Sequence, residues 1–269
     1  MNKTPPTQID YHVHTRLCNH AHGTMEQYVR CAIEKGVAEL CFLDHLTLNE
    51  QGCDLSMGPE DVPLYVYAVR RLQERYRDRI DVKLGMEVDF TPDRMAEAVR
   101  ILDRFSFDMI GGSIHFVDDR NIVSSKTNGS GISPDDAEFF DQYLSLIETM
   151  ADYSCFDVIC HLDVVKKFGI QPPVDFFEKM DAILEKIKYK DLVIEVNTSG
   201  LSHPARAIYP ELVILKRCFE KNIPVTFGSD AHRPEQVGRH FGKAAEILRN
   251  IGYRHITGFN RRKRYTISI

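Results

Sequence analysis

The sequence predicts an α/β fold in which a strand and a helix alternate seven times. Seven short segments rich in apolar residues each end in a polar cluster, which is typical of buried parallel strands that run into functional loops. Stretches with helical periodicity lie between them. The strand ends recur at intervals of about 36 residues, which is the size of a βα unit with its loops.

The elements follow in order along the chain. The expected strands cover residues 9–15, 40–45, 82–90, 109–116, 158–163, 192–197 and 225–232. The expected helices cover residues 25–35, 60–77, 94–105, 135–153, 174–187, 210–221 and 235–250. The first and last of these helices stop at Gly36 and Gly252, while Ser133-Pro134-Asp135-Asp136 and Pro172-Pro173 signal the starts of two others.

The chain is expected to form a single domain over residues 1–269. No linker rich in Pro, Gly or Ser interrupts the series of βα units, and the nearest candidate for a flexible segment is residues 124–133. The tail, residues 253–269, is expected to end in a short edge strand or an irregular closing segment. Neither an internal repeat nor a low-complexity tract is evident.

Composition excludes several classes of protein. The 269 residues carry a formal net charge of −5, with 43% hydrophobic and 27% charged residues, as in an ordinary globular protein. No apolar run approaches the roughly 18 residues of a membrane span, and the first residues lack a signal-peptide core, so a cytoplasmic location without membrane contact is expected. The acidic balance does not favour nucleic acid. The basic run 261–264 is expected to be a solvated face.

Potential metal ligands end six of the seven expected strands. His12 and His14 lie two residues apart, which places both imidazoles on one face of the first strand. The other candidates at or after strand ends are His20, His22, His45, Glu87, His115, His161, Asp230 and His232. A lone histidine at a strand end is more often structural, but this recurrence predicts a metal site.

The donor types narrow the choice of metal. Imidazoles with one or two carboxylates suit zinc, iron(II) or manganese, whereas calcium and magnesium prefer oxygen ligands. A four-coordinate ion uses three or four side chains, so about nine candidates call for two or three divalent ions.

These residues lie in motifs that resemble those of the polymerase-and-histidinol-phosphatase (PHP) superfamily. The motifs, in order, are Asp10-Tyr11-His12-Val13-His14-Thr15, Asp44-His45, Gly85-Met86-Glu87-Val88-Asp89, Gly112-Ser113-Ile114-His115-Phe116, Cys160-His161-Leu162-Asp163 and Gly228-Ser229-Asp230-Ala231-His232. The resemblance runs from about residue 9 to about residue 240. Within the superfamily, residues 164–168, 195–200 and 209–210 resemble the histidinol-phosphatase branch.

The resemblance implies a distorted (β/α)7 TIM-like barrel with a trinuclear metal centre. It places the first ion between His12, His14, Glu87 and Asp230. Glu87 would bridge to a second ion held by His115 and His161, and the third ion would be held by His20, His45 and His232. His22 lies beside His20 and is the alternative ligand, although the family register favours His20.

Charge arithmetic favours a phosphate substrate. Three divalent ions, two carboxylates and a bridging hydroxide leave about three positive charges to receive a phosphate dianion. The expected reaction is hydrolysis by in-line attack of a metal-activated hydroxide on phosphorus. The third ion, Asp230 or His232 would assist the leaving alkoxide, and these two residues are the catalytic candidates. Lys166 and Arg206 follow strand ends and are the candidates for phosphate binding, with solvation as the simpler alternative.

The neighbours of the expected ligands have open roles. Asp10, Asp44 and Asp163 adjoin ligand histidines, so they either orient the imidazoles or cap the strand ends. Cys160 is expected to point away from the metal site into the core. His240 and His255 are expected at the surface or behind the ligands, whereas His203, which follows the sixth strand, could belong to either class.

The leading function is therefore a metal-dependent phosphomonoesterase that hydrolyses L-histidinol phosphate in histidine biosynthesis. One alternative is a PHP phosphoesterase acting on a nucleotide or a small diester. The others are a metal-dependent amidohydrolase and a metal-retaining binding or regulatory module without turnover.

Two departures from the branch pattern bear on the substrate. Ser202 and His203 follow Leu201 where a basic residue is common in relatives, and the loop 117–133 is unusual. The sequence does not indicate an oligomeric state.

Overall fold

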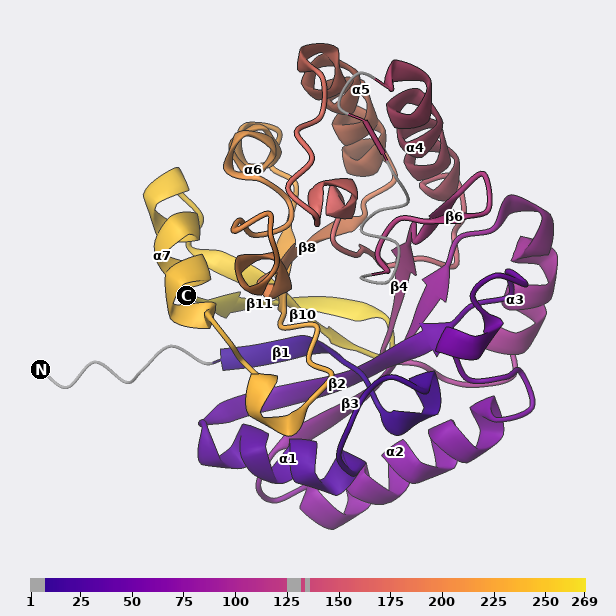
Figure 1. Ribbon diagram of the computed structural model, residues 1–269. Helices are drawn as coiled ribbons and strands as arrows, with labels where there is room; N and C mark the ends of the chain where they lie inside the picture. Colours follow the sequence, from indigo (N-terminus) through magenta and orange to yellow (C-terminus); the bar gives the residue numbers. More distant parts are fainter. Residues whose placement is uncertain (1–7, 125–131, 134–135) are drawn as a thin grey trace, which may run out of the picture.

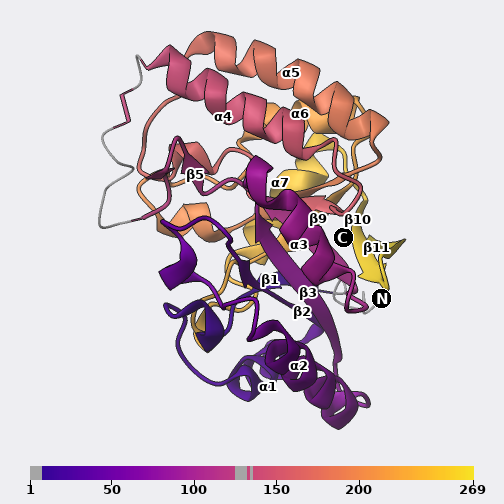
Figure 2. The same ribbon diagram turned by 90° about the vertical axis from the view of Figure 1, so that its right-hand side faces the viewer.

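The computed structural model describes residues 8–124, 132–133 and 136–269. Seven parallel strands form one sheet in the order β1-β2-β3-β4-β7-β8-β9, and helices cover its outer side (Figure 1, Figure 2). The strands are β1 Gln8–Val13, β2 Val37–Leu46, β3 Asp81–Asp89, β4 Met109–Ser113, β7 Val158–Ile159, β8 Val193–Asn197 and β9 Val225–Gly228. The helices are α1 Met25–Glu34, α2 Val62–Tyr76, α3 Met95–Leu102, α4 Ala137–Met150, α5 Val174–Tyr189, α6 Leu212–Glu220 and α7 Phe241–Ile251. This arrangement confirms the predicted α/β barrel.

The barrel closes between its first and last strands at their carboxyl ends. Val13 and Ala231 form a parallel bridge, the His14 amide donates to the Ala231 carbonyl at 3.0 Å, and the Ala231 amide donates to the His12 carbonyl at 3.2 Å. The two strands come together through this bridge, so the sheet is a nearly closed barrel. The closure brings the first and last ligand motifs of the chain together.

Glycines keep the barrel interior narrow. A Cβ atom at Gly111 would lie 2.5 Å from Cys160 Sγ, and one at Gly85 would lie 2.6 Å from Leu43 Cδ1. Real Cβ atoms do not approach other heavy atoms this closely, because packed interiors leave no free volume. The absence of a side chain at these glycines leaves room for side chains of the neighbouring strands inside the barrel.

The C-terminal tail forms a hairpin of its own. β10 (His255–Asn260) and β11 (Lys263–Ser268) pair antiparallel in a separate two-stranded sheet, so the tail ends in a short edge strand as expected, but not as part of the barrel sheet. The Phe259 amide donates to Tyr11 Oη at 3.0 Å, and Thr226 Oγ1 donates to the Thr257 carbonyl at 2.8 Å. The hairpin is thus joined to the first and last strands of the barrel.

The basic run at the hairpin turn is not simply solvated. Arg262 Nε lies 3.0 Å from Asp157 Oδ2, and Arg264 pairs with Asp191. Asp157 precedes β7 and Asp191 precedes β8, so the hairpin lies across the amino ends of the strands. All four residues of the run are exposed, as predicted, and these two arginines each have a carboxylate partner as well.

Several predicted elements end earlier than the sequence suggested. β7 and β9 stop at Ile159 and Gly228, so the ligand candidates after them lie in turns. The last helix begins at Phe241, because His240 adopts a left-handed conformation with φ of 60°. The shorter elements are β5 Phe116–Val117, β6 Arg120–Asn121 and the 3-10 helices η1 Arg16–Cys18, η2 Cys53–Leu55, η3 Pro92–Arg94, η4 Val164–Lys166, η5 Ser199–Ser202 and η6 Pro234–Gln236.

Two predicted features, the flexible segment 124–133 and the start of the helix 135–153, lie partly outside the described residues. Most of the candidate flexible segment 124–133 and the first residue of the expected helix 135–153 lie outside the described residues. Among the helices that are described, none has the length and apolar character needed to cross a membrane.

Candidate metal centre

Glu87 lies at the centre of a group of imidazoles at the carboxyl ends of the strands. It projects from β3 with no exposed surface. Its Oε2 atom lies 2.9 Å from His45 Nδ1, 3.2 Å from His12 Nε2 and 3.7 Å from His14 Nε2. Its Oε1 atom lies 2.9 Å from His161 Nε2 and 3.6 Å from His115 Nε2. The two oxygens thus face two different sets of nitrogens, as a carboxylate shared between two cations would.

His20 and His232 meet at the outer side of this group. Their Nε2 atoms lie 2.9 Å apart. His20 Nδ1 lies 2.6 Å from the Cys18 carbonyl and His232 Nδ1 lies 3.1 Å from the Asp230 carbonyl. Because a carbonyl can only accept a hydrogen bond, each Nδ1 carries the proton and donates it.

In the neutral rings, each of the two facing Nε2 atoms therefore carries a lone pair and no proton. Partial desolvation and the neighbouring His45 and His14 lower the pKa of His20 to about 4, and burial holds the pKa of His232 well below its usual range, so both rings are neutral at pH 7. Two lone pairs at this distance repel each other unless a cation lies near both. The donor set consequently fits divalent transition-metal ions, whose usual protein ligand is the neutral imidazole.

Asp230 connects the inner and outer parts of the cluster. Its Oδ1 atom lies 3.1 Å from His14 Nε2 and 3.4 Å from His232 Nδ1, and Ser199 Oγ donates to its Oδ2 at 3.1 Å. Asp230 and His161 both have positive φ, 51° and 26°. Non-glycine residues rarely adopt this conformation, and it tends to be retained at functional sites where the surrounding structure enforces it.

Three further carboxylates contact ligand imidazoles at Nδ1, on the side of each ring away from the Nε2 atom that faces the cluster. Glu195 Oε1 lies 2.6 Å from His12 Nδ1, Asp44 Oδ1 lies 3.4 Å from His14 Nδ1, and Asp89 Oδ1 lies 3.5 Å from His115 Nδ1. Carboxylates in this position fix the orientation and the tautomer of a ligand imidazole. Of the open alternatives, Asp44 has both the orienting and the capping role, because it also accepts hydrogen bonds from the Thr15 and His45 amides at 3.1 and 3.0 Å.

Asp10 and Asp163 cap strand ends and do not contact a ligand imidazole at its ring nitrogen. Asp10 accepts hydrogen bonds from the Ser229 and Gly238 amides at 2.9 and 2.8 Å, and Asp163 pairs with Lys166. Both carboxylates therefore secure backbone or basic neighbours.

Sequence reasoning missed Glu195 and Asp89 as parts of the site. Glu195 is a buried carboxylate within the otherwise apolar strand β8, and Asp89 follows Glu87 at a spacing of two residues. A buried charge in an apolar strand requires a partner, and this signal could have identified Glu195.

Burial and charge act in opposite directions on the inner residues. Burial alone would lower the pKa of His14, but hydrogen bonds to Asp230 and Asp44 outweigh it and raise the pKa to about 9. Burial alone would raise the pKa of Glu87, but His12 and His45 hold it well below its usual range. Burial raises the pKa of Asp89 to about 8. Without metal, the inner cluster therefore retains protons that an incoming cation would have to displace.

The remaining histidines lie away from the cluster or at its edge. Both His20 and His22 are exposed, but His22 contributes only an amide that donates to the His232 carbonyl, whereas His20 Nε2 lies 2.9 Å from His232 Nε2, so His20 is the imidazole that faces the cluster. His240 is exposed beside Ser202, and His255 is exposed at the start of the C-terminal hairpin. His203 is partly buried, and burial lowers its pKa to about 4.

The thiol of Cys160 does not point away from the ligands as expected. It lies within 4.8 Å of donor atoms of His12 and Glu195. Strict alternation does not apply here because β7 ends at Ile159, before Cys160, but the side chain is buried in the core as expected. Burial raises the pKa of Cys160 to about 12, so the thiol stays protonated at neutral pH.

The basic candidates have different surroundings. Lys166 is buried, with Nζ 2.7 Å from Asp163 Oδ2 and 3.7 Å from Glu211 Oε2, whereas Arg206 is exposed. Their role in phosphate binding stays a prediction. Arg239, which the sequence analysis did not single out, donates to the Ser229 and Asp230 carbonyls at 2.9 and 3.0 Å and so braces the turn that carries Asp230.

Comparison with known families identifies the relationship. A model described as "PHP domain" matches residues 10–199, more than half of the chain, and a model described as "PHP-associated" matches residues 216–251. The chain belongs to the PHP-domain family. The resemblance seen in the sequence motifs is thereby confirmed.

Relatives of this PHP protein span nearly its whole length. A protein of Deinococcus radiodurans named "Probable histidinol-phosphatase" is 33% identical over 94% of this chain and 97% of its own. The "Histidinol-phosphatase" of Bacillus subtilis is 26% identical over 85% and 95%. The crystal structure of histidinol phosphate phosphatase from Lactococcus lactis, complexed with zinc, L-histidinol and phosphate, has a TM-score of 0.82 with 22% identity, covering 96% of this chain and 99% of its own. That similarity shows a shared fold.

Proposed function

We propose that this PHP protein hydrolyses L-histidinol phosphate to L-histidinol and inorganic phosphate, a step of histidine biosynthesis. The protein is a hydrolase of phosphoric monoesters, as its family and its relatives over nearly the whole chain indicate. The named activity of those relatives, and the zinc, L-histidinol and phosphate in the Lactococcus lactis structure, support the specific substrate. A cytoplasmic location is part of the same proposal.

The observation that carries the proposal is the arrangement of donors around Glu87. Two or three divalent ions of zinc, iron or manganese are proposed to occupy the cluster, with the ligand sets that the family resemblance implies. The members of those sets are His12, His14, His20, His45, Glu87, His115, His161, Asp230 and His232. Such ions would supply charge neutralisation for the phosphate and a nucleophilic water at neutral pH.

The residues of the chain orient this machinery. Glu195, Asp44 and Asp89 hold three imidazoles in fixed directions, which limits the reorganisation needed when a substrate binds. Asp230 and His232 have side chains that are 20% and 27% exposed, whereas Glu87 and His14 have none exposed. The two partly exposed residues, or the third ion, are therefore proposed to assist the leaving alkoxide, which needs a proton or a cation.

The substrate is tested by comparing two esters. Histidinol phosphate should be hydrolysed with a kcat/KM on the order of a hundredfold above that of p-nitrophenyl phosphate, because contacts to the imidazole and amine orient the ester. Steady-state kinetics of the metal-loaded protein with both compounds measures this ratio. Similar values for both esters would instead favour a phosphoesterase of broad specificity.

A further inference from the structure

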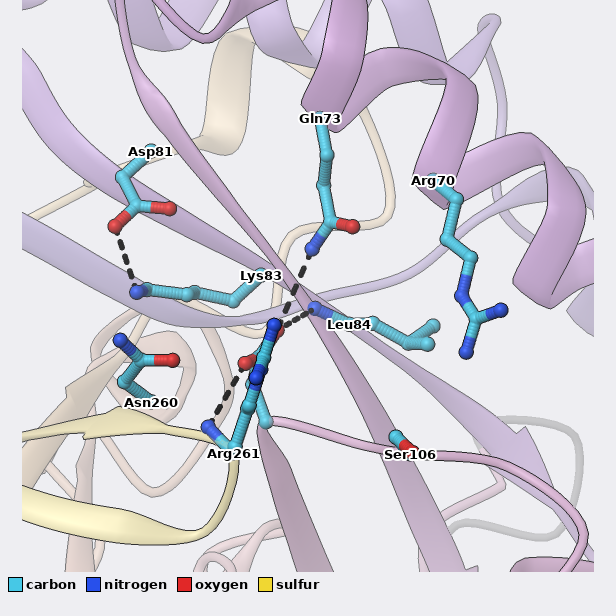
Figure 3. A pocket seen from close by; sticks show the side chains of 9 residues that line it. Arg70, Gln73, Asp81, Lys83, Leu84, Ser106, Asn260 and Arg261 are labelled. Carbon is cyan, nitrogen blue, oxygen red and sulfur yellow. Dashed lines mark hydrogen bonds and ion pairs between the residues drawn. The ribbon is translucent and has the colours of Figure 1, made fainter.

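A cavity of about 550 Å³ lies at the amino ends of the strands, away from the Glu87 cluster. Its lining comes from α2, the start of β3, the segment before β4 and the turn of the C-terminal hairpin (Figure 3). A volume of this size is typical of small-molecule sites. The lining residues that matter here are Arg70, Lys83, Ser106, Asn260 and Arg261.

Two arginines of this cavity lack a carboxylate partner among the described residues. Arg70 and Arg261 are exposed and have no ion pair, whereas their neighbours in the sequence do: Arg71 pairs with Glu74 and Arg262 with Asp157. In Figure 3 the Arg261 side chain projects between Lys83 and Arg70. The guanidinium donors of this cavity are thus available to a ligand.

Lys83 adds a buried charge to the same cavity. Its side chain is only 5% exposed, and Nζ lies 2.6 Å from Asp81 Oδ2 at the rim (Figure 3). An ammonium has three donors, so Lys83 can hold Asp81 and still donate to a ligand. A buried ammonium is costly unless anions surround it, and Asp81 itself is 57% exposed.

The other carboxylate of the cavity is already occupied by protein donors. Asp108 accepts hydrogen bonds from the Leu84 amide at 2.9 Å and from the Arg261 amide at 3.0 Å. It therefore fixes the hairpin turn against β3 and has little capacity left to neutralise the arginine side chains. Ser106 and Asn260 add neutral hydrogen-bonding groups to the lining.

The positive charge continues beyond the cavity. A second hollow of about 400 Å³ shares Asn260 and Arg261 and is also lined by Lys263, which has no ion pair among the described residues, and by Arg264, which is paired with Asp191. An anion with charge spread over several oxygens would reach more of these donors than a single carboxylate would, because phosphate oxygens accept from guanidinium and ammonium groups together.

We infer that this cavity is a binding site for a small polyphosphate anion, separate from the metal centre. The site is defined by Arg70, Lys83 and Arg261. The inference is independent of the proposed function, since none of these residues touches the Glu87 cluster in the described structure.

Inorganic triphosphate is the probe for this site. Calorimetric titration should show binding to the wild-type protein that weakens at least tenfold in the double variant Arg70→Gln/Arg261→Gln. Both side chains are exposed, so the variant should fold normally. The control Arg71→Gln/Arg249→Gln removes the same charge from exposed positions of α2 and α7 and should bind triphosphate as the wild type does.

Chemical protection locates the bound anion. Triphosphate should protect Arg70 and Arg261, but not Arg71, from phenylglyoxal, as mapped by mass spectrometry. This protection should persist after treatment with a chelator, because the site needs no metal. Unchanged affinity in the double variant, or protection that disappears with the metal, would overturn the inference. Binding of an eight-nucleotide single-stranded RNA at these arginines without binding of triphosphate would also overturn it.

Discussion

Glu87 shares its two oxygens between two groups of imidazoles, and no isosteric residue can reproduce this. Replacing Glu87 by Gln keeps the shape but removes the charge and turns one acceptor into a donor that faces ring nitrogens. We expect metal content to fall and kcat/KM to drop at least about a hundredfold. Elemental analysis and steady-state kinetics on the same preparations measure both effects.

The matched control is His240→Gln, because His240 is exposed beside Ser202 and has no place in the cluster. Its kcat/KM should stay within about twofold of the wild type. A Glu87→Gln variant that kept full metal and activity would remove Glu87 from the centre.

His14 links metal binding to pH. Its pKa of about 9 in the metal-free chain lies above the ordinary value, so a proton must leave before the ring can bind a cation. Metal affinity should therefore rise about tenfold per pH unit, for one proton released, as pH increases toward 9. Competition titrations with a metal indicator at several pH values measure this slope.

The same shift predicts the opposite trend for the metal-free chain. A raised pKa in the folded state gives stability that is fully present below the ordinary pKa of 6.5 and is lost as pH rises through about 9. Thermal unfolding of the chelated protein across this window should show the decline. Metal affinity that is constant with pH would exclude a protonated His14 in the free site.

At the residue scale, the sequence identified the metal ligands better than the carboxylates that orient them. His12, His14 and His45 were predictable because imidazoles at successive strand ends are improbable by chance. Glu195 was missed, because its role depends on a 2.6 Å contact with His12, 183 residues away in the chain. Contacts of this kind depend on how the barrel closes, and local sequence patterns do not predict that closure.

At the scale of the elements, Arg262 holds the C-terminal hairpin to the barrel. Its guanidinium contacts Asp157 and donates to the Ser154 and Cys155 carbonyls at 3.2 and 2.9 Å. Arg262→Ala should lower the free energy of unfolding by about 1–2 kcal/mol, after allowance for the partly exposed position of Arg262. Urea denaturation measures this loss.

Lys263→Ala is the control for that variant, since Lys263 is exposed and next to Arg262 in the sequence. It should change the unfolding free energy by less than about 0.5 kcal/mol. Both variants should keep the wild-type kcat/KM, because the hairpin lies at the opposite end of the strands from the ligands. Equal stability of the two variants would show that the Arg262 contacts contribute nothing.

The hairpin also shows why this element escaped prediction. Arg261 and Arg262 have φ values of 49° and 64°, the left-handed conformation that a two-residue hairpin turn requires. Asn-Gly or Asp-Gly normally signals such a turn, and Arg-Arg does not. By contrast, the seven βα units were predictable, because buried parallel strands are short, nearly continuous apolar segments and the helices between them have a clear period.

At the scale of the whole molecule, bound metal should stabilise the fold. The ligands come from β1, β2 and β3 and from the loops after β1, β4, β7 and β9, so a cation that binds only the native arrangement shifts the folding equilibrium. Removing metal with a chelator should lower the Tm, and adding zinc should restore it. One site saturated at a hundredfold excess over its Kd corresponds to about 2.7 kcal/mol.

The Glu87→Gln variant controls for unrelated effects of the chelator, since its Tm should respond less. Elemental analysis must confirm that the metal has been removed. An unchanged Tm in fully stripped wild-type protein would mean that the cluster is equally well formed without cations.

The seam between β1 and β9 has a consequence for the order in which the protein matures. His12 and His14 leave the ribosome early, whereas Asp230 and His232 emerge more than 200 residues later. The two ends of the barrel are joined there by backbone hydrogen bonds from the His14 amide to the Ala231 carbonyl and from the Ala231 amide to the His12 carbonyl. A cation shared by His14 and Asp230 would therefore fasten the start of the barrel to its end. The cell could not load such a centre fully until synthesis of the barrel was complete.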